Sequence, residues 1–185
     1  MKLNRHFHLA TLAVVLAFAG QVMGQSSSAS STLYMQLTAA KQGVIKGEVI
    51  QKGREGLHRL LAYSHEIVMP RDPATGLPTG KRQHQPFRIV KLLNQGSPQL
   101  MTAMTTAEDL SSVVIDVWTP TLAGTEIKLI TYTLTNAHIV SLRPWMPNHS
   151  DTSAQAYPPA EEIAFTYQSI TVTYQPGGIV SADEW

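Results

Sequence analysis

Eight short runs rich in Val, Ile, Thr, Tyr and Phe occupy much of the chain between residues 32 and 174, and they constrain the fold more than any other feature. β-Branched and aromatic residues favour extended strands, and several of the runs alternate apolar with polar positions. The sequence therefore predicts a mainly β domain. The expected strands are Thr32–Thr38, Gly43–Ile50, Leu57–Met69, Gln85–Leu93, Ser112–Thr119, Glu126–Thr135, His138–Arg143 and Glu162–Tyr174.

Two of these runs change the face on which their apolar residues lie. In Glu126–Thr135 the apolar positions switch parity after Leu129, and in Glu162–Tyr174 they switch after Tyr167. A strand that changes face needs a bulge or a corner. Long strands with corners close small barrels and orthogonal sandwiches, so we expect a small two-sheet β-barrel.

One segment, Ser97–Leu110, departs from the strand pattern. Ser97 is a good N-cap residue and Pro98 suits the first helical position. Apolar residues follow at helical spacing, including Met101 and Met104, which we interpret as core filling because Met commonly packs gaps. The sequence predicts one α-helix flanking the barrel.

The N-terminus has the pattern of a Sec-type signal peptide over residues 1–24. Lys2 and Arg5 precede a short apolar run, Leu9–Gly20, and a cleavage position after Gly24 fits. That run is too short to span a bilayer as a stable helix, although an uncut amphiphilic anchor remains the alternative. Residues 25–31 read as a Ser-rich leader, residues 32–185 as the barrel domain, and the end from Gln175 as a turn and a loose tail.

Composition excludes several classes of function. The chain has no cysteine, so disulfides, thiolate metal sites and thiol catalysis are excluded. Its formal net charge is +1, with 14 Lys+Arg against 13 Asp+Glu, which argues against nucleic acid as a partner. No histidines stand at metal-binding spacing, and we expect neither a metal nor a cofactor.

Catalytic patterns are weak. Ser64 and His65 are neighbours on a predicted strand, so they point to opposite faces, and the same holds for Glu161 and Glu162. Asp116 lies within an apolar strand, where it faces solvent, a subunit neighbour or the barrel interior. The sequence shows no nucleophile with an adjacent base, so we expect no enzyme activity.

The most distinctive local feature is a loop, Pro70–Arg82, with three prolines, two glycines and four charges. Prolines restrict such a loop and glycines permit tight turns. A loop of this length in a compact domain is usually functional, although a plain solvated hairpin extension is equally compatible with the sequence. A phosphate-binding loop is excluded, because Arg82 stands where Ser or Thr is needed.

The order of these elements resembles the haemolysin-coregulated protein (Hcp) family, the tube subunits of the bacterial type VI secretion system. The resemblance covers roughly residues 33–185. The matching motifs, in chain order, are Asp72-Pro73-x-x-Gly76-x-Pro78-x-Gly80-x-Arg82-x-His84-x-Pro86-Phe87, Ser97-Pro98-Gln99-Leu100, Leu134-Thr135-Asn136-Ala137-His138-Ile139, Met146-Pro147, Glu161-Glu162-Ile163 with Tyr167, and Ala182-Asp183-Glu184-Trp185.

The resemblance implies a barrel that assembles into hexameric rings, which stack into a tube. Spike and sheath proteins and small effector proteins would be its partners, and the long loop would reach toward a neighbouring ring. The ring-stacking residues carried over by position are Pro70, Arg71, Asp72, Pro73, Gly76, Pro78, Gly80, Lys81 and Arg82.

Two alternatives stay open, and one feature departs from the family. A monomeric periplasmic or secreted binding module could present Trp118, Trp145 or Tyr157 as an aromatic platform. A small hydrolase is the second alternative.

The departure is the signal peptide, since family members ordinarily leave the cytoplasm through their own apparatus. The chain is expected to be secreted or periplasmic, with no membrane span after cleavage.

Overall fold

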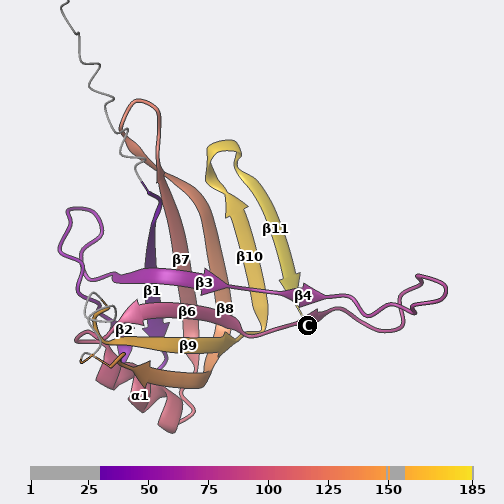
Figure 1. Cartoon of the computed structure of the whole chain (residues 1–185), viewed down its shortest axis with the longest axis horizontal. Coiled ribbons are helices and arrows are strands. Elements are labelled where there is room, and N and C mark those ends of the chain that lie inside the picture. The colour runs from indigo at the N-terminus through magenta and orange to yellow at the C-terminus, as the bar shows by residue number, and fades with distance from the viewer. Residues whose placement is uncertain (1–29, 149, 151–156, 185) are drawn as a thin grey trace, which may run out of the picture.

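A computed structural model describes residues 30–148, 150 and 157–184; residues 1–29, which include the expected signal peptide and most of the leader, lie outside this part. Strands dominate the described chain (Figure 1). The elements are β1 (Thr32–Ala39), β2 (Gly43–Ile45), β3 (His58–Ser64), β4 (Ile67–Val68), β5 (Gln83–His84), β6 (Phe87–Leu92), α1 (Ser97–Thr105), β7 (Leu110–Pro120), β8 (Glu126–Trp145), β9 (Ala160–Thr166), β10 (Ser169–Tyr174), a 3₁₀ turn (Gln175–Gly177) and β11 (Ile179–Glu184).

Six antiparallel strands close into a barrel in the order β8-β7-β1-β3-β6-β9. Closure depends on β8, which pairs with β7 up to Ala137 and with β9 from His138 onward. In Figure 1, β1, β7 and the first part of β8 cross β3, β6 and β9 at a steep angle, so the barrel has two layers. The predicted fold class, a small two-sheet β-barrel with one flanking helix, is confirmed.

The long strand β8 corrects one prediction. Glu126–Thr135 and His138–Arg143 were expected as separate strands, but they form one strand of 20 residues. The bend lies at Asn136, whose φ of 49° is positive, and the Asn136 Nδ2 donates to Gln168 Oε1 at 2.6 Å. Asn tolerates this left-handed backbone better than most residues, so the strand turns there without ending.

The two predicted changes of face are both present, in different forms. In β8 the register moves from Val117 opposite Ile130 to Trp118 opposite Lys128, which leaves Leu129 as the extra residue of a bulge. The other change is a break between β9 and β10, which therefore are two strands. A parity change in sequence thus predicts a discontinuity without saying which kind.

The core lies inside the barrel, where Met35, Leu37, Phe87, Ile115 and Phe165 are fully buried. These side chains come from β1, β6, β7 and β9, because every second residue of each strand points inward. The aromatic ring of Phe87 packs against neighbouring rings at centroid distances of 5.3–5.7 Å. Inward alternation around a closed sheet is what gives this small barrel a filled interior.

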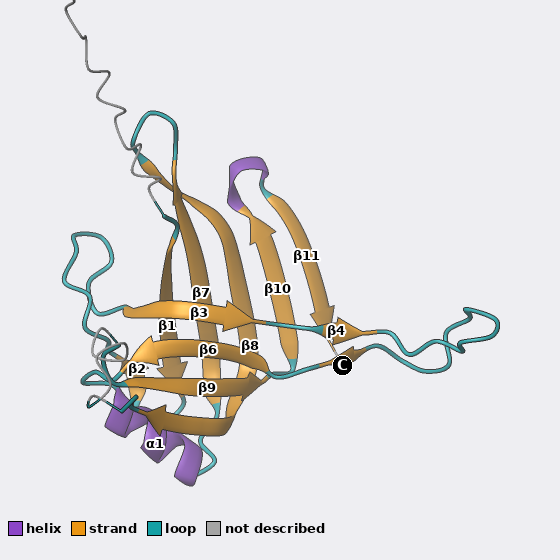
Figure 2. Ribbon diagram, in the orientation of Figure 1, coloured by secondary structure: helices purple, strands orange, loops and turns teal. Residues whose placement is uncertain are grey.

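Helix α1 covers one end of the barrel (Figure 2) and buries Leu100 and Ala103. It is shorter than predicted, because it ends at Thr105 and Leu110 already begins β7. Gly96, rather than Ser97, is its N-cap residue. Met101 is exposed, so its interpretation as core filling was wrong.

The C-terminal end is ordered, which corrects the prediction of a loose tail. Strand β11 pairs antiparallel with β10 over six residues, from Ser169 opposite Glu184 to Tyr174 opposite Ile179. The turn between them uses Gly178 at a φ of 61°. Predicting this strand from sequence was difficult because its residues are nearly all exposed and show no apolar alternation.

Candidate assembly arm and buried polar network

The loop Pro70–Arg82 extends a hairpin that begins with the pairing of β4 and β5 (Figure 1). We call residues 67–84 the arm. Figure 2 shows the arm projecting well beyond the barrel. Its backbone is hydrogen-bonded across the hairpin, with Thr79 N donating to Pro70 O at 2.9 Å and Asp72 N to Leu77 O at 2.8 Å. The arm is therefore an ordered hairpin extension.

Asp72 organises the tip of the arm. Its Oδ1 accepts from Thr75 N at 2.7 Å, Thr75 Oγ1 at 2.9 Å and Ala74 N at 3.0 Å. Hydrogen bonds from Thr75 and Ala74 favour the charged carboxylate and lower the pKa of Asp72. Arg71 Nη1 donates to Gly76 O at 2.9 Å, and Gly76 has a φ of 71°, which a glycine adopts without strain.

The base of the arm is tied to the C-terminal strand. Arg82 forms an ion pair with Asp183 and donates to Glu184 O at 2.9 Å. His84 Nε2 contacts the same Asp183 carboxylate at 2.9 Å. The hydrogen bond from Arg82, followed by that from His84, lowers the pKa of Asp183 to about 2. Strand β11 thus fixes the angle at which the arm leaves the barrel.

A cluster of rings lies under this attachment. The Tyr167 hydroxyl bridges His84 Nδ1, at 3.2 Å, and His65 Nε2. Burial, and secondarily the nearby His84, lowers the pKa of His65, while burial raises the pKa of Tyr167. His65 also stacks on Phe87 with ring centroids 5.3 Å apart. The arm therefore joins the barrel through packed side chains rather than through backbone alone.

The structure places the nine predicted stacking residues together on the arm. Pro70 and Asp72 are half-buried within the hairpin, and the other seven are exposed: Arg71, Pro73, Gly76, Pro78, Gly80, Lys81 and Arg82. Arg71, Asp72 and Arg82 already bond within the chain. Lys81 is exposed next to Arg82, toward the base of the arm, so it presents a positive charge to solvent.

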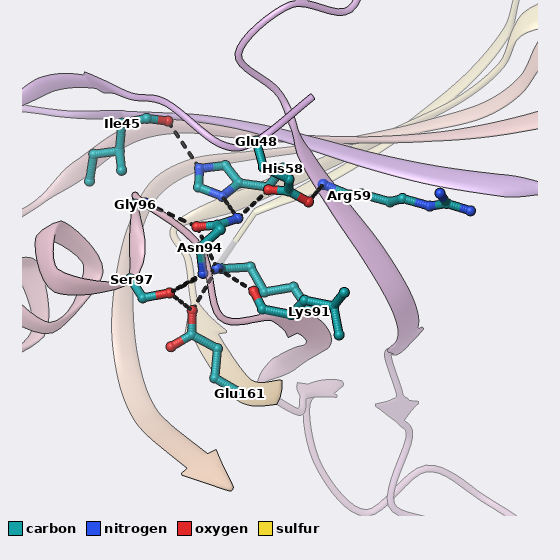
Figure 3. A network of polar contacts seen from close by, with 10 residues as sticks. Ile45, Glu48, His58, Arg59, Lys91, Asn94, Gly96, Ser97 and Glu161 are labelled. Atoms are coloured by element: carbon teal, nitrogen blue, oxygen red, sulfur yellow. Dashed lines mark hydrogen bonds and ion pairs between the residues drawn. The ribbon is translucent and has the colours of Figure 1, made fainter. Parts of the chain in front are cut away.

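A second polar site lies inside the barrel end near α1, centred on Lys91 and Glu161 (Figure 3). These residues stand directly opposite each other on β6 and β9, and Lys91 Nζ lies 2.6 Å from Glu161 Oε1. Both side chains are essentially inaccessible, at 0% and 1% exposure. Lys91 also donates to Asn94 Oδ1 at 2.9 Å, and Ser97 Oγ donates to Glu161 Oε1 at 2.8 Å.

His58 and Asn94 extend this network toward the surface. His58 Nε2 donates to Ile45 O at 3.0 Å, which leaves Nδ1 to accept from Asn94 Nδ2 at 3.2 Å. Asn94 Nδ2 also donates to Glu48. Burial lowers the pKa of both His58 and Lys91. With His58 neutral, both of its ring nitrogens have a hydrogen-bond partner in Figure 3.

Sequence analysis missed this network, although strand parity contained the signal. Lys91 follows Phe87 and Ile89 at every second position of β6, and Glu161 precedes Ile163 and Phe165 in the same way on β9. A charged residue at the parity of core residues points inward. Two such residues of opposite charge on neighbouring strands would have predicted a buried ion pair.

The other candidate residues lie apart. Glu162 is on the outer surface with Arg88, at 3.3 Å. Asp116 is also on the outer face, nearly covered, where Thr131 Oγ1 donates to it at 2.7 Å and Lys128 lies at 2.8 Å. In the described part of the chain, no group of three or more His, Asp or Glu could hold a metal ion, and no helix is long and apolar enough to cross a membrane.

The aromatic platform of the binding-module alternative is not open at Trp118. Arg54 lies 3.7 Å from the centre of the Trp118 indole ring, and Lys128 lies 5.6 Å away. Trp145 and Tyr157 are exposed. At Trp118, the indole face that a ligand would need is therefore occupied by cations of the chain itself.

The closed barrel, helix α1 and the anchored arm define a class: a small β-barrel whose distinguishing surface feature is a protruding arm. The model of the family described as "Type VI secretion system effector, Hcp" matches residues 34–174. The chain belongs to this family.

Relatives and solved structures agree with this assignment. The "Major exported protein" of Pseudomonas aeruginosa is 35% identical over 161 residues, which cover 82% of this chain and 94% of that protein. The structure of Hcp1 from Escherichia coli EAEC 042 is 32% identical with a TM-score of 0.74, covering 83% of this chain and 98% of that one. The secreted protein Hcp3 of Pseudomonas aeruginosa is 28% identical with a TM-score of 0.70, covering 84% and 99%.

Proposed function

We propose that this chain is the tube subunit of a type VI secretion system. Its copies would close into hexameric rings, and the rings would stack into a tube that leaves the cell. The observation that carries the proposal is family membership over residues 34–174, joined to a closed barrel that holds out an ordered arm. Spike, sheath and small effector proteins are the partners that the family resemblance suggests.

The buried titratable groups support a structural role over a catalytic one. Lys91, Glu161 and His58 are enclosed at 0–1% exposure and bonded to one another or to their neighbours. A catalytic group must reach a substrate within hydrogen-bond distance. Groups that are sealed and satisfied in this way stabilise one packing arrangement instead.

The arm is the proposed ring-stacking element. It lies outside the core, so it is free to contact another ring without disturbing the barrel. Pro70, Pro73 and Pro78 restrict its backbone before docking, which reduces the entropy lost on contact. Its charges select a docking position more than they add affinity.

Ring formation has a direct test. We expect the purified chain from Gln25 to Trp185 to sediment as a closed oligomer with the mass of six subunits. Closing a ring buries, between subunits, surfaces that a lone barrel would expose to solvent. A monomer that persists at high concentration would contradict the ring and favour the binding-module alternative.

A separate proposal concerns residues 1–24 and the route by which the protein is exported. We expect these residues to be removed as a signal peptide after Gly24, since a basic start precedes a short apolar run. Edman sequencing of the protein from its native host should begin at Gln25. An intact Met1 on soluble cytoplasmic protein would rule this out while leaving the ring proposal standing.

A further inference from the structure

A surface groove lies at the end of the barrel that carries the loop between β2 and β3. Residues 46–50, 55–56 and 92–95 line it, and its volume is about 650 Å³. Its apolar residues include Ile50, which is 92% exposed, and Leu93, which is 45% exposed. Side chains of this kind at the surface, gathered around a hollow, are typical of a contact site.

The groove has fixed walls. Gly47 N donates to Gly56 O at 2.8 Å, Gly56 N donates to Val49 O at 2.8 Å, and Gln95 donates across the groove floor to Gly47 O. Arg54, which directly precedes the lining residue Glu55, is itself held in place, because its guanidinium lies over Trp118 and pairs with Glu126 at 2.9 Å. A preformed groove loses little entropy when it is occupied.

The groove and the arm lie at opposite ends of the same strand pair. Strands β3 and β6 are antiparallel, with Leu60 opposite Lys91 at one end and Ser64 opposite Arg88 at the other. The groove residues adjoin the start of β3 and the end of β6, whereas the arm connects the end of β3 to the start of β6. Figure 1 shows the arm at the right and the loop beside the groove at the left.

The arm matches the groove in chemistry. Leu77 is 65% exposed and offers an apolar side chain to the apolar groove. Arg71 and Lys81 are exposed cations on the arm, and Glu48 and Glu55 are carboxylates of the groove lining. Opposite charges around an apolar centre are the usual pattern of a protein–protein contact.

We infer that the groove of each subunit receives the arm tip of a second copy of this chain in the next ring. The contact is heterologous, arm into groove, so each subunit both donates and receives, and the contact repeats along the stack. This inference rests on the proposed tube function and adds the receiving surface to it.

Disulfide trapping tests the contact, because the chain has no cysteine of its own. The double variant Leu77→Cys with Ile50→Cys should form, under mild oxidation, a ladder of covalent multimers on a non-reducing gel. A disulfide requires Cα atoms within about 7 Å, so the ladder reports proximity. Each single variant should run as a monomer, because the proposed contact never brings two tips or two grooves together.

Leu122 provides the matched control. It is fully exposed on the turn between β7 and β8, outside the groove. The double variant Leu77→Cys with Leu122→Cys should give no ladder. An equal ladder from this control would mean random collision and would overturn the inference.

The outcomes distinguish a failure of the groove contact from a failure of the tube function. Stacked rings visible by electron microscopy, without a ladder from the Leu77 and Ile50 pair, would overturn the groove and leave the tube function intact. A chain that forms neither rings nor a ladder would overturn both. A second variant, Ile50→Asp, should keep the ring mass and shorten tubes several-fold, and tubes of normal length from it would contradict the inference.

Discussion

The ion pair between Lys91 and Glu161 illustrates how single side chains specify this barrel. Desolvating two charges is costly, and the pair is tolerated because each partner also bonds to a neighbouring polar group. Gly96 belongs to the same site. A Cβ there would lie 2.5 Å from His58 Cε1, so only glycine lets the start of α1 approach the network.

Breaking the pair should be far more damaging than breaking its exposed counterpart. We expect Lys91→Met to lower the free energy of unfolding by about 3–5 kcal/mol, because Glu161 would be left buried without its partner charge. The matched control is Arg88→Met, three residues earlier on β6, whose exposed pair with Glu162 contributes about 0–1 kcal/mol. Urea unfolding measures both, and equal losses would contradict the buried-pair account.

The packed histidines predict the direction of the pH dependence. Burial lowers the pKa of His58 and His65 in the folded chain, so the unfolded chain takes up these protons first as the pH falls. Stability should therefore be retained above about pH 6.5 and decline below it. Because His65→Phe removes one titrating group and keeps a ring against Phe87, its loss of stability between pH 7.5 and pH 5.5 should be smaller than that of the parent chain. An identical loss would show that His65 does not contribute.

At the scale of elements, β11 and the arm depend on each other. Strand β11 pairs only with β10 among the described strands, and its Asp183 holds the arm base through Arg82 and His84. A strand at the edge of a sheet needs such side-chain contacts, because one of its sides has no backbone partner.

Removing the Asp183 charge should loosen the arm without unfolding the barrel. We expect Asp183→Asn to speed trypsin cleavage within the arm, after Arg71, Lys81 or Arg82, while circular dichroism stays unchanged. The adjacent variant Glu184→Gln is the control, because Glu184 contacts Arg82 only through its backbone oxygen. Equal cleavage rates in the two variants would show that the ion pair does not restrain the arm.

At the scale of the whole molecule, the barrel supplies the stability of the fold, and the arm supplies the proposed contact surface. The core cluster draws on the barrel strands, β2, α1, β10 and Tyr167, and it contains no residue of the arm between Ile67 and His84. Replacing a surface loop changes the entropic free energy of loop closure only slightly, so the sequence of the tip can change while the barrel stays folded.

Replacing the tip should therefore separate stacking from ring closure. We expect a short Gly-Ser linker in place of Thr75–Gly80 to leave folding and ring mass nearly unchanged and to shorten or abolish tubes seen by electron microscopy. Loss of the ring itself would mean that the arm also serves the interface within a ring. Tubes of normal length from this variant would show that the tip of the arm has no role in stacking.

The sequence by itself determined the features that depend on near neighbours. Alternation of apolar residues predicted most of the strands and a discontinuity after Leu129, and the prolines and glycines predicted a long, restricted loop at Pro70–Arg82. The order of short motifs predicted the family. These are local patterns, because side chains two residues apart on a strand share a face whatever the strand pairs with.

Only the tertiary structure decided which segments meet. It joined two predicted strands into β8, ordered the exposed β11, tied Asp183 to the arm, and brought Lys91 opposite Glu161. Strand β11 shows no apolar alternation, so local pattern did not reveal it. Parity marks Lys91 and Glu161 as inward-pointing, but only the pairing of β6 with β9 brings them opposite each other. Strand pairing gains its free energy from non-local contacts, so the sheet order around the barrel, and not the sequence around each residue, fixed both the arm's attachment and the buried network.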